Sequence, residues 1–144
     1  MKREEKGHGD SKQLLAARRW LSSQSQAILD DQIEIARTPA PPFQERARAE
    51  LVTSKVEPLD LEPELDDIGN VLVPLPPNGS GTDRQPVIIA AHLDTVFEAD
   101  TPVRIRNVGR RWIGPGIADN ARGLAVAISV VRALVQCHVQ PRHP

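Results

Sequence analysis

The strongest structural constraint in this sequence is the uninterrupted apolar run Val87–Ala91, which follows a proline and is rich in β-branched residues. A short run of this kind is typical of a strand buried on both faces, as in the centre of a parallel sheet. The clearest helix is predicted over residues 120–136, where almost every position outside one narrow stripe is apolar. With a short strand over residues 71–73 and an alternating segment over residues 102–108, the order of elements predicts an α/β fold.

Two helices are expected before the first strand. Residues 1–10 are polar and are expected to form a flexible N-terminus. From about Ser11, a helical pattern carries one apolar stripe at a spacing of seven, with charged and glutamine residues on the other faces: Leu14, Leu21, Ile28 and Ile35. The prolines after Thr38 end this helix, and a second one is expected from Pro42 with three apolar residues at a spacing of four: Phe43, Ala47 and Leu51.

The later elements show two further patterns. In the segment 102–108, Val103 and Ile105 are expected to face inward and the arginines between and after them outward. The helix over residues 120–136 is expected to be mostly buried, and its polar residues fall on one stripe: Arg122, Ser129, Arg132 and Gln136.

Charge and composition exclude several classes of protein. The 144 residues include 18 basic and 19 acidic ones, so the chain lacks the basic excess of a general nucleic-acid or anionic-membrane binder. A single cysteine, Cys137, allows no internal disulfide and favours a reducing compartment. Met1–Asp10 carries no apolar leader, and no apolar run is long enough to span a bilayer. These features predict a cytoplasmic protein without nucleic-acid or membrane partners.

The first candidate for chemistry is the sequence His92-Leu93-Asp94 at the carboxyl end of the apolar strand. In an α/β sheet, ligands bind beyond this end of the strands. His92 and Asp94 project to the same side of an extended chain, where the carboxylate can hold one imidazole nitrogen while the other binds a metal. The alternative is a polar strand end with a locally hydrogen-bonded histidine.

The second candidate is the glycine-rich turn Gly114–Gly123, which opens into the buried helix and contains Asp119. Asp119 can be interpreted as the N-cap of that helix or as a metal ligand at the edge of the sheet. A phosphate cradle is a third interpretation, since glycine loops before helices bind anions. It is the weakest, because the third glycine of the dinucleotide fingerprint and a Lys-Ser/Thr pair are missing and Asp119 would repel phosphate.

The two motifs, in this order, resemble the co-catalytic dizinc peptidase and deacylase family, which includes peptidase T, glutamate carboxypeptidase, acetylornithine deacetylase and the aminoacylases. Thr38–Glu45 is similar to the early proline turn of that family, and Asp67–Val71 to its Asp-x-x-Gly-Asn strand entry. The resemblance covers residues 28–135. It implies a zinc-peptidase-like α/β fold, a partial three-layer sandwich with a mostly parallel central sheet.

The resemblance also implies a site and a reaction. His92 would ligate a metal, Asp94 would take a catalytic role by orienting and polarising the imidazole, and Asp119 would bridge two metals. The peptide bond from Asp119 to Asn120 is often cis in such enzymes. Two zinc ions, with cobalt or manganese as alternatives, would share a water that attacks the carbonyl of a peptide or N-acyl amino acid.

The groups that complete such a site do not follow in the sequence. No glutamate occurs after Glu98 and no acidic residue after Asp119, so a general base and further ligands are missing. We therefore expect residues 11–136 to be the N-terminal part of a catalytic domain and residues 137–144 a tail at a truncation point. The lid and dimerisation domain, which oligomerisation would require, is expected to be absent. Such a fragment is expected to be inactive alone; the alternatives are a non-catalytic α/β binding module or remnant and a phosphate or nucleotide binder.

Overall fold

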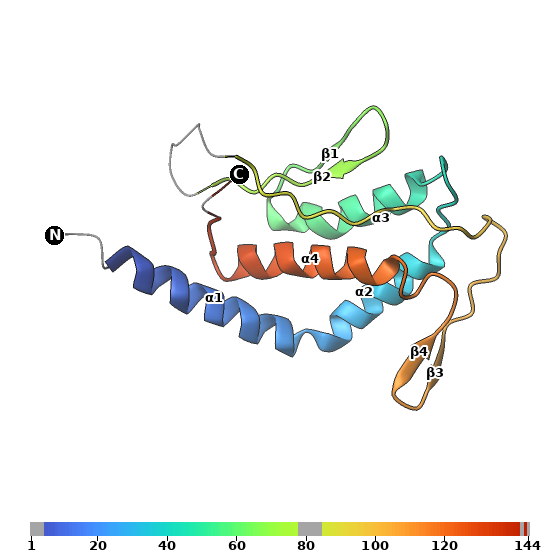
Figure 1. Cartoon of the computed structure of the whole chain (residues 1–144), viewed down its shortest axis with the longest axis horizontal. Coiled ribbons are helices and arrows are strands. Elements are labelled where there is room, and N and C mark those ends of the chain that lie inside the picture. The colour runs from blue at the N-terminus through green and yellow to red at the C-terminus, as the bar shows by residue number, and fades with distance from the viewer. Residues whose placement is uncertain (1–4, 78–84, 142, 144) are drawn as a thin grey trace.

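The structure, a computed structural model, describes residues 5–77, 85–141 and 143. Helix α4 lies in the middle of this part of the chain, with α3 on one side and α1 and α2 on the other (Figure 1). The elements follow in the order α1 (Glu5–Ser23), α2 (Ser25–Arg37), α3 (Arg46–Val56), the 3-10 turn η1 (Glu57–Leu59), β1 (Glu64–Leu65), β2 (Val71–Leu72), β3 (Arg106–Val108), β4 (Arg111–Ile113) and α4 (Ala121–Gln136).

The predicted C-terminal helix is confirmed, since α4 differs from the expected range by one residue. The single N-terminal helix expected from Ser11 is instead two helices that meet at Gln24. The hydroxyls of Ser22 and Ser23 bond to backbone carbonyls of the preceding turn, an interaction that competes with helix propagation. Helix α1 begins at Glu5, inside the stretch expected to be flexible, and residues 1–4 lie outside the described residues.

The core forms where α2, α3 and α4 meet. The apolar stripe of the N-terminal helices contributes to it unequally, because Ile35 in α2 is fully buried while Leu14 in α1 is 50% exposed. The buried cluster consists mainly of aliphatic residues from these three helices: Ile35, Ala36, Val52, Val56, Ala121, Leu124, Ala125 and Ile128. A core of this kind, without a single aromatic ring, relies on close helix contacts around alanines.

The prediction for the second helix was wrong in its start and in its buried face. Helix α3 begins at Arg46, and Phe43 lies in the preceding turn with 99% of its surface exposed. That turn is closed by the Gln44 amide, which donates to the carbonyl of Pro41 over 2.9 Å. The buried side of the helix is therefore a different one from that expected: Arg48, Ala49, Val52 and Val56.

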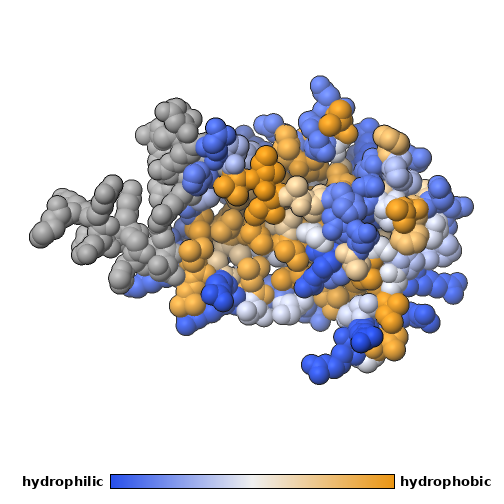
Figure 2. All heavy atoms as spheres, in the orientation of Figure 1, coloured by the Kyte–Doolittle hydropathy of each residue, from blue (hydrophilic) through white to orange (hydrophobic). Residues whose placement is uncertain are grey.

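The sheet is much smaller than expected. In the described part of the chain, β1 pairs antiparallel with β2 and β3 antiparallel with β4, so the mostly parallel sheet is not among these strands. The segment 87–91 has no strand partner there, and residues 87–90 are exposed, with Ile88 at 81%, so the expected burial on both faces was wrong. Burial of a strand on both faces requires neighbouring strands, and among the residues that the structure describes none flanks this segment. In the view of Figure 2, apolar atoms lie at the surface over the middle of the molecule.

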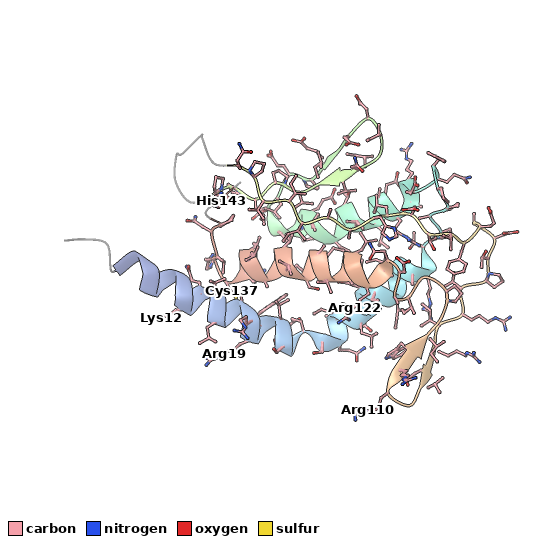
Figure 3. The ribbon with its side chains drawn as sticks, in the orientation of Figure 1. Lys12, Arg19, Arg110, Arg122, Cys137 and His143 are labelled. Carbon is pink, nitrogen blue, oxygen red and sulfur yellow. The ribbon has the colours of Figure 1, made fainter. Side chains whose placement is uncertain are left out.

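The other expected strands are confirmed in part. The turn Asp66–Asn70 leads into β2, as expected from its composition. Of the segment 102–108, only β3 is a strand, but the predicted alternation holds: Val103 and Ile105 are partly buried and the arginines exposed. Arg110 lies at the tip of the β3–β4 hairpin (Figure 3). Among the described residues, no helix combines the length and the apolar character that crossing a membrane requires.

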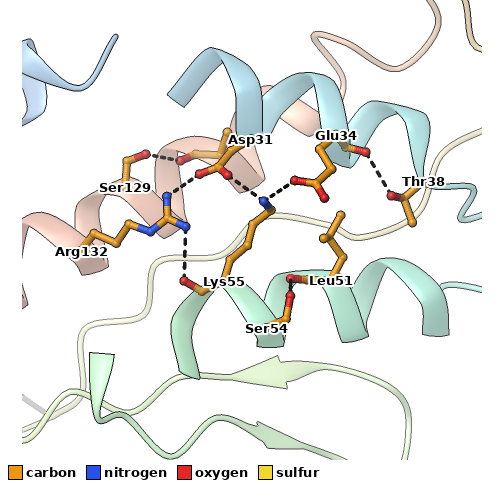
Figure 4. A network of polar contacts seen from close by, with 9 residues as sticks. Asp31, Glu34, Thr38, Leu51, Ser54, Lys55, Ser129 and Arg132 are labelled. Carbon is orange, nitrogen blue, oxygen red and sulfur yellow. Dashed lines mark hydrogen bonds and ion pairs between the residues drawn. The ribbon is translucent and has the colours of Figure 1, made fainter. Parts of the chain in front are cut away.

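A buried polar network joins the three core helices (Figure 4). Asp31 of α2 is 8% exposed and bonds both to Lys55 Nζ of α3, over 2.7 Å, and to the guanidinium of Arg132 in α4. Lys55 also contacts Glu34 at 2.6 Å. Burial lowers the pKa of Lys55, but the bonds to these carboxylates outweigh it and the pKa is raised. The expectation that charged residues of the N-terminal helices face away from the core was thus wrong at Asp31.

Candidate metal centre

The structure brings the three predicted site residues together. The imidazole of His92 lies between two carboxylates, with Nδ1 at 3.0 Å from Oδ1 of Asp94 and Nε2 at 2.9 Å from Oδ1 of Asp119. Asp119 comes from the turn before α4, 27 positions further along the chain. The two motifs that the sequence offered separately therefore form one cluster, with one carboxylate on each nitrogen of the imidazole.

The cluster is open to solvent and acidic. About half of the His92 side chain is exposed, and that of Asp119 is 88% exposed. Burial lowers the pKa of His92, but the hydrogen bonds to Asp119 and Asp94 outweigh it, so the pKa is raised above its usual value. The arrangement stabilises positive charge at the imidazole, whether this charge is a proton or a cation placed between Nε2 and Asp119.

The turn that carries Asp119 is shaped by two glycines. A Cβ on Gly114 would lie 2.9 Å from the backbone oxygen of Arg104, and Gly116 has a φ of +68°. The Asp119–Asn120 peptide bond is cis, as the family resemblance implies. The N-cap position of α4 is Asn120, so the interpretation of Asp119 as the N-cap was wrong.

Helix α2 contacts this turn through one buried side chain. Gln32 is 7% exposed, and its Nε2 donates to the carbonyl of Ile117 over 2.5 Å. Its Oε1 accepts a bond from Arg122, which reaches from α4 toward α2 (Figure 3). A buried side-chain amide that uses both its donor and its acceptor fixes the position of the turn relative to two helices.

Arg48 holds the His92-Leu93-Asp94 motif in place. Its guanidinium donates to the carbonyl of Leu93 over 2.7 Å and makes two bonds, of 2.6 and 3.1 Å, to the carbonyl of Thr38. The residue is 1% exposed, and burial lowers its pKa although the charge of Asp94 acts in the opposite direction. Since Leu93 stands between the two site residues, this one side chain ties their backbone to the turn after α2.

Thr95 carries the one buried side-chain polar atom that lacks a hydrogen-bond partner among the described residues. The residue is 7% exposed, and its backbone amide donates to the carbonyl of Ala40 over 2.8 Å. Its hydroxyl oxygen faces Gly116, with 3.6 Å to the position of a Cβ there.

We expect Thr95→Val to raise the free energy of unfolding by about 1 kcal/mol, since it removes a buried polar group without changing the shape of the side chain. The matched control is Thr38→Val, which deletes a hydroxyl bonded to the Glu34 carbonyl at 3.0 Å and is expected to cost about 0.5–1 kcal/mol. Urea unfolding followed by circular dichroism measures both. A clear destabilisation by Thr95→Val would show that the hydroxyl has a partner in solution.

The donor set fits a metal ion in part. An imidazole nitrogen and a carboxylate oxygen converge, and the second imidazole nitrogen is held by a carboxylate, as at many histidine metal sites. Within the described ranges, however, no group of three or more histidine, cysteine, aspartate or glutamate residues is placed to hold a metal. His92 and Asp119 therefore form two ligands of a site that needs more.

Sequence reasoning missed the residues that support the cluster. Arg48 and Gln32 are both buried polar residues on helices, where the helical pattern assigns such residues to solvent. The sequence held no signal for these two residues, because only the folded chain shows how closely α2 and α3 approach the two motifs.

A family model and a curated relative both match this chain. The family model described as peptidase family M28 matches residues 70–144, just over half of the chain, and these residues include all three members of the cluster. Cytosol non-specific dipeptidase from Escherichia coli (strain K12) is 27% identical over 119 residues. That alignment covers 74% of this chain and 24% of the dipeptidase, so the chain spans about a quarter of the length of this curated relative.

Proposed function

Since the chain belongs to peptidase family M28, a family of co-catalytic zinc peptidases, we propose that His92 and Asp119 are metal ligands in a hydrolase of peptide or N-acyl amino acid amide bonds. The observation that carries the proposal is the position of the His92 imidazole, bracketed by Asp94 and Asp119 at 3.0 and 2.9 Å. The dipeptidase relative, by its printed name, acts on dipeptides, which makes short peptides the first substrates to test.

In this proposal Asp94 positions the histidine. Its carboxylate accepts the proton of Nδ1, which leaves Nε2 with a lone pair directed at the side of the ring where Asp119 lies. Only Oδ1 of Asp119 faces His92 in this contact, and the Asp119 side chain is 88% exposed, so its second oxygen is available to a second ion. A bound zinc would polarise the scissile carbonyl and lower the pKa of water.

We also propose a three-layer sandwich with a mostly parallel sheet, in which Val87–Ala91 has the composition of an inner strand. We likewise propose a cytoplasmic location, in agreement with the word cytosol in the name of the relative. These 144 residues alone are proposed to bind metal without turnover, since no acidic residue follows Asp119 to take a proton. A phosphate site at the glycine turn is not favoured, because two carboxylates stand beside it.

Zinc titration by calorimetry tests the site. We expect one zinc to bind the unmodified chain with a Kd in the micromolar range, weaker than a complete site because only two side chains ligate it. His92→Ala and Asp119→Ala are each expected to abolish measurable binding. Asp94→Asn is expected to weaken it about 10–100-fold, because it removes the carboxylate that orients the imidazole.

The matched control is His138→Ala, which removes an exposed histidine just after α4. It is expected to leave the zinc affinity unchanged. Equal losses in His138→Ala and His92→Ala, or no binding by the unmodified chain, would contradict the metal site and favour a non-catalytic module.

A further inference from the structure

Two short antiparallel hairpins in this chain carry opposite charges. The hairpin of β3 and β4 lies in the stretch 103–118, which contains arginines and no acidic residue: Arg104, Arg106, Arg110 and Arg111. The hairpin of β1 and β2 lies in the stretch 57–77, which contains acidic residues and no basic one: Glu57, Asp60, Glu62, Glu64, Asp66 and Asp67. The nearly balanced charge of the whole chain therefore hides two regions of opposite sign.

The outer face of the β3–β4 hairpin, here called the basic hairpin, combines arginines with aliphatic residues. Its register places Arg106 opposite Ile113 and Arg111 opposite Val108, and residues directly opposite each other share a face. All four are exposed, Val108 at 56% and Ile113 at 47%. Ile105, which precedes Arg106 and projects to the other side, packs against the core. This hairpin therefore turns both arginines and both aliphatic side chains to solvent.

The arginines of the basic hairpin are available to a partner. Within the described ranges, none of the arginines of residues 103–118 takes part in an ion pair. Arg110 lies at the tip, where it extends the charge beyond the strands (Figure 3). A guanidinium has five donors in a fork that matches a carboxylate. Beside exposed aliphatic side chains, such groups fit a surface that combines carboxylates with apolar residues.

The β1–β2 hairpin, here called the acidic hairpin, has such a surface. Glu64 lies opposite Leu72, so the two share a face, and Leu72 is 49% exposed. Val71, which follows the opposite direction, packs against the core. In the turn between the strands, Ile68 is 85% exposed and Asp67 beside it is exposed as well. Neither Glu64 nor Asp67 takes part in an ion pair with another described residue.

Both hairpins also have open edges. Among the residues that the structure describes, each forms a sheet of two strands only. A two-stranded sheet is marginally stable by itself, and its edges present amides and carbonyls that can pair with a further strand. In Figure 1, α3 and α4 lie between the two hairpins, so the hairpins do not face each other within one molecule. A contact between them requires two molecules.

We propose that the basic hairpin of one molecule docks on the acidic hairpin of a second copy of this chain. Arg106 and Arg111 lie against carboxylates that include Glu62 and Glu64, and the exposed aliphatic side chains of the two hairpins contact each other. The choice of a second copy rests on charge complementarity, because the chain itself carries the acidic and apolar surface that the basic hairpin fits. The contact joins two different surfaces, so repeated contacts build a ring or an open chain of molecules.

Sedimentation velocity of the unmodified chain is the first test, with a chelator present throughout. At about 0.01 M salt we expect the sedimentation coefficient to rise with protein concentration. At about 1 M salt we expect a monomer, because charges exposed to solvent are then screened within a few ångströms. This comparison uses no variant and so does not depend on the folding of one.

Two double variants test the pairing of the hairpins. Arg106→Gln with Arg111→Gln removes charge from the basic hairpin, and Glu62→Gln with Glu64→Gln removes it from the acidic one. Each variant alone is expected to associate about tenfold more weakly than the unmodified chain. Mixed in equal amounts, the two are expected to form a 1:1 dimer and nothing larger, because one unmodified hairpin of each sign remains.

The mixture also locates the contact. With the Glu62→Gln, Glu64→Gln variant labelled, its backbone amide signals at residues 106–113 are expected to shift when the other variant is added. The matched control is Arg18→Gln with Arg19→Gln, which removes two exposed arginines of α1 and is expected to leave the association unchanged. Far-UV circular dichroism shows whether each variant is folded.

Three outcomes would overturn the proposal: a monomer at every concentration in low salt, equal weakening by the α1 control, or no shifts at residues 106–113 in the mixture. A chain that stays monomeric but binds a single-stranded oligonucleotide through the basic hairpin would overturn it in favour of a nucleic-acid site. Because no metal is present, these results are independent of the zinc titration and of the proposed hydrolase function.

Discussion

Replacing Asp31 by alanine is expected to lower the free energy of unfolding by about 3–5 kcal/mol, the usual cost of breaking a buried ion pair by removing one partner. Asp31 is the acceptor shared by Lys55 of α3 and Arg132 of α4. The Lys55 side chain is 11% exposed and that of Arg132 is 24% exposed, so neither can regain full hydration without movement of a helix. Urea unfolding followed at 222 nm measures the loss.

Asp31→Asn separates charge from shape, because it keeps the size of the side chain but not its charge. We expect it to recover less than half of the stability that Asp31→Ala loses. Glu34→Ala removes the other carboxylate that bonds to Lys55. The Glu34 side chain is 57% exposed, so this variant is expected to cost no more than about 1 kcal/mol. Similar losses for Glu34→Ala and Asp31→Ala would show that the buried position of Asp31 has no special weight.

Arg48→Met is expected to cost about 3 kcal/mol, because it leaves the carbonyls of Thr38 and Leu93 without their donor in a buried place. Methionine retains much of the volume and adds no polar group, so the loss reports the hydrogen bonds rather than a cavity. Chemical unfolding measures the stability. The amide signals of residues 92–95 are expected to shift as well, since the bond to Leu93 lies between the two site residues.

The matched control is Arg46→Met on the same helix, whose side chain is 85% exposed and bonds to Glu50. It is expected to change stability by no more than about 0.5 kcal/mol. Arg48→Lys keeps the charge but has one nitrogen in place of a fork, so it can reach one carbonyl only and is expected to recover less than half of the loss. Full recovery by lysine would mean that charge alone stabilises this position.

The predictability of the fold differs between its elements for physical reasons. Helix α4 could be predicted nearly to the residue because apolar positions cover most of its surface, a pattern that only a buried helix satisfies. The partners of its polar stripe could not, since Arg132 bonds to Asp31, 101 positions away, and no local pattern encodes such a pair. The prediction that Val87–Ala91 is buried was wrong for a related reason. The composition of a segment indicates what it can bury, not whether neighbouring strands are present.

The candidate site was predictable in its residue types and less so in its support. His92 and Asp94 are two positions apart on an extended segment, so a bond between them follows from strand geometry. The approach of Asp119 depends on the path of the chain from residue 95 to residue 118, and a family resemblance suggested it where spacing alone could not. Phe43 illustrates the limit of helical periodicity, since the pattern placed it in a core and the turn places it in solvent.

Helix α2 and the turn after it contact both halves of the candidate metal centre. Gln32 holds the carbonyl of Ile117 at 2.5 Å, and the carbonyl of Ala40 accepts the amide of Thr95 at 2.8 Å. Neither contact is local in sequence, so the two motifs stay in register only while α2 is folded. The centre therefore belongs to the same cooperative opening unit as the helical core, and its geometry lasts as long as that unit stays closed rather than following the faster motions of surface loops.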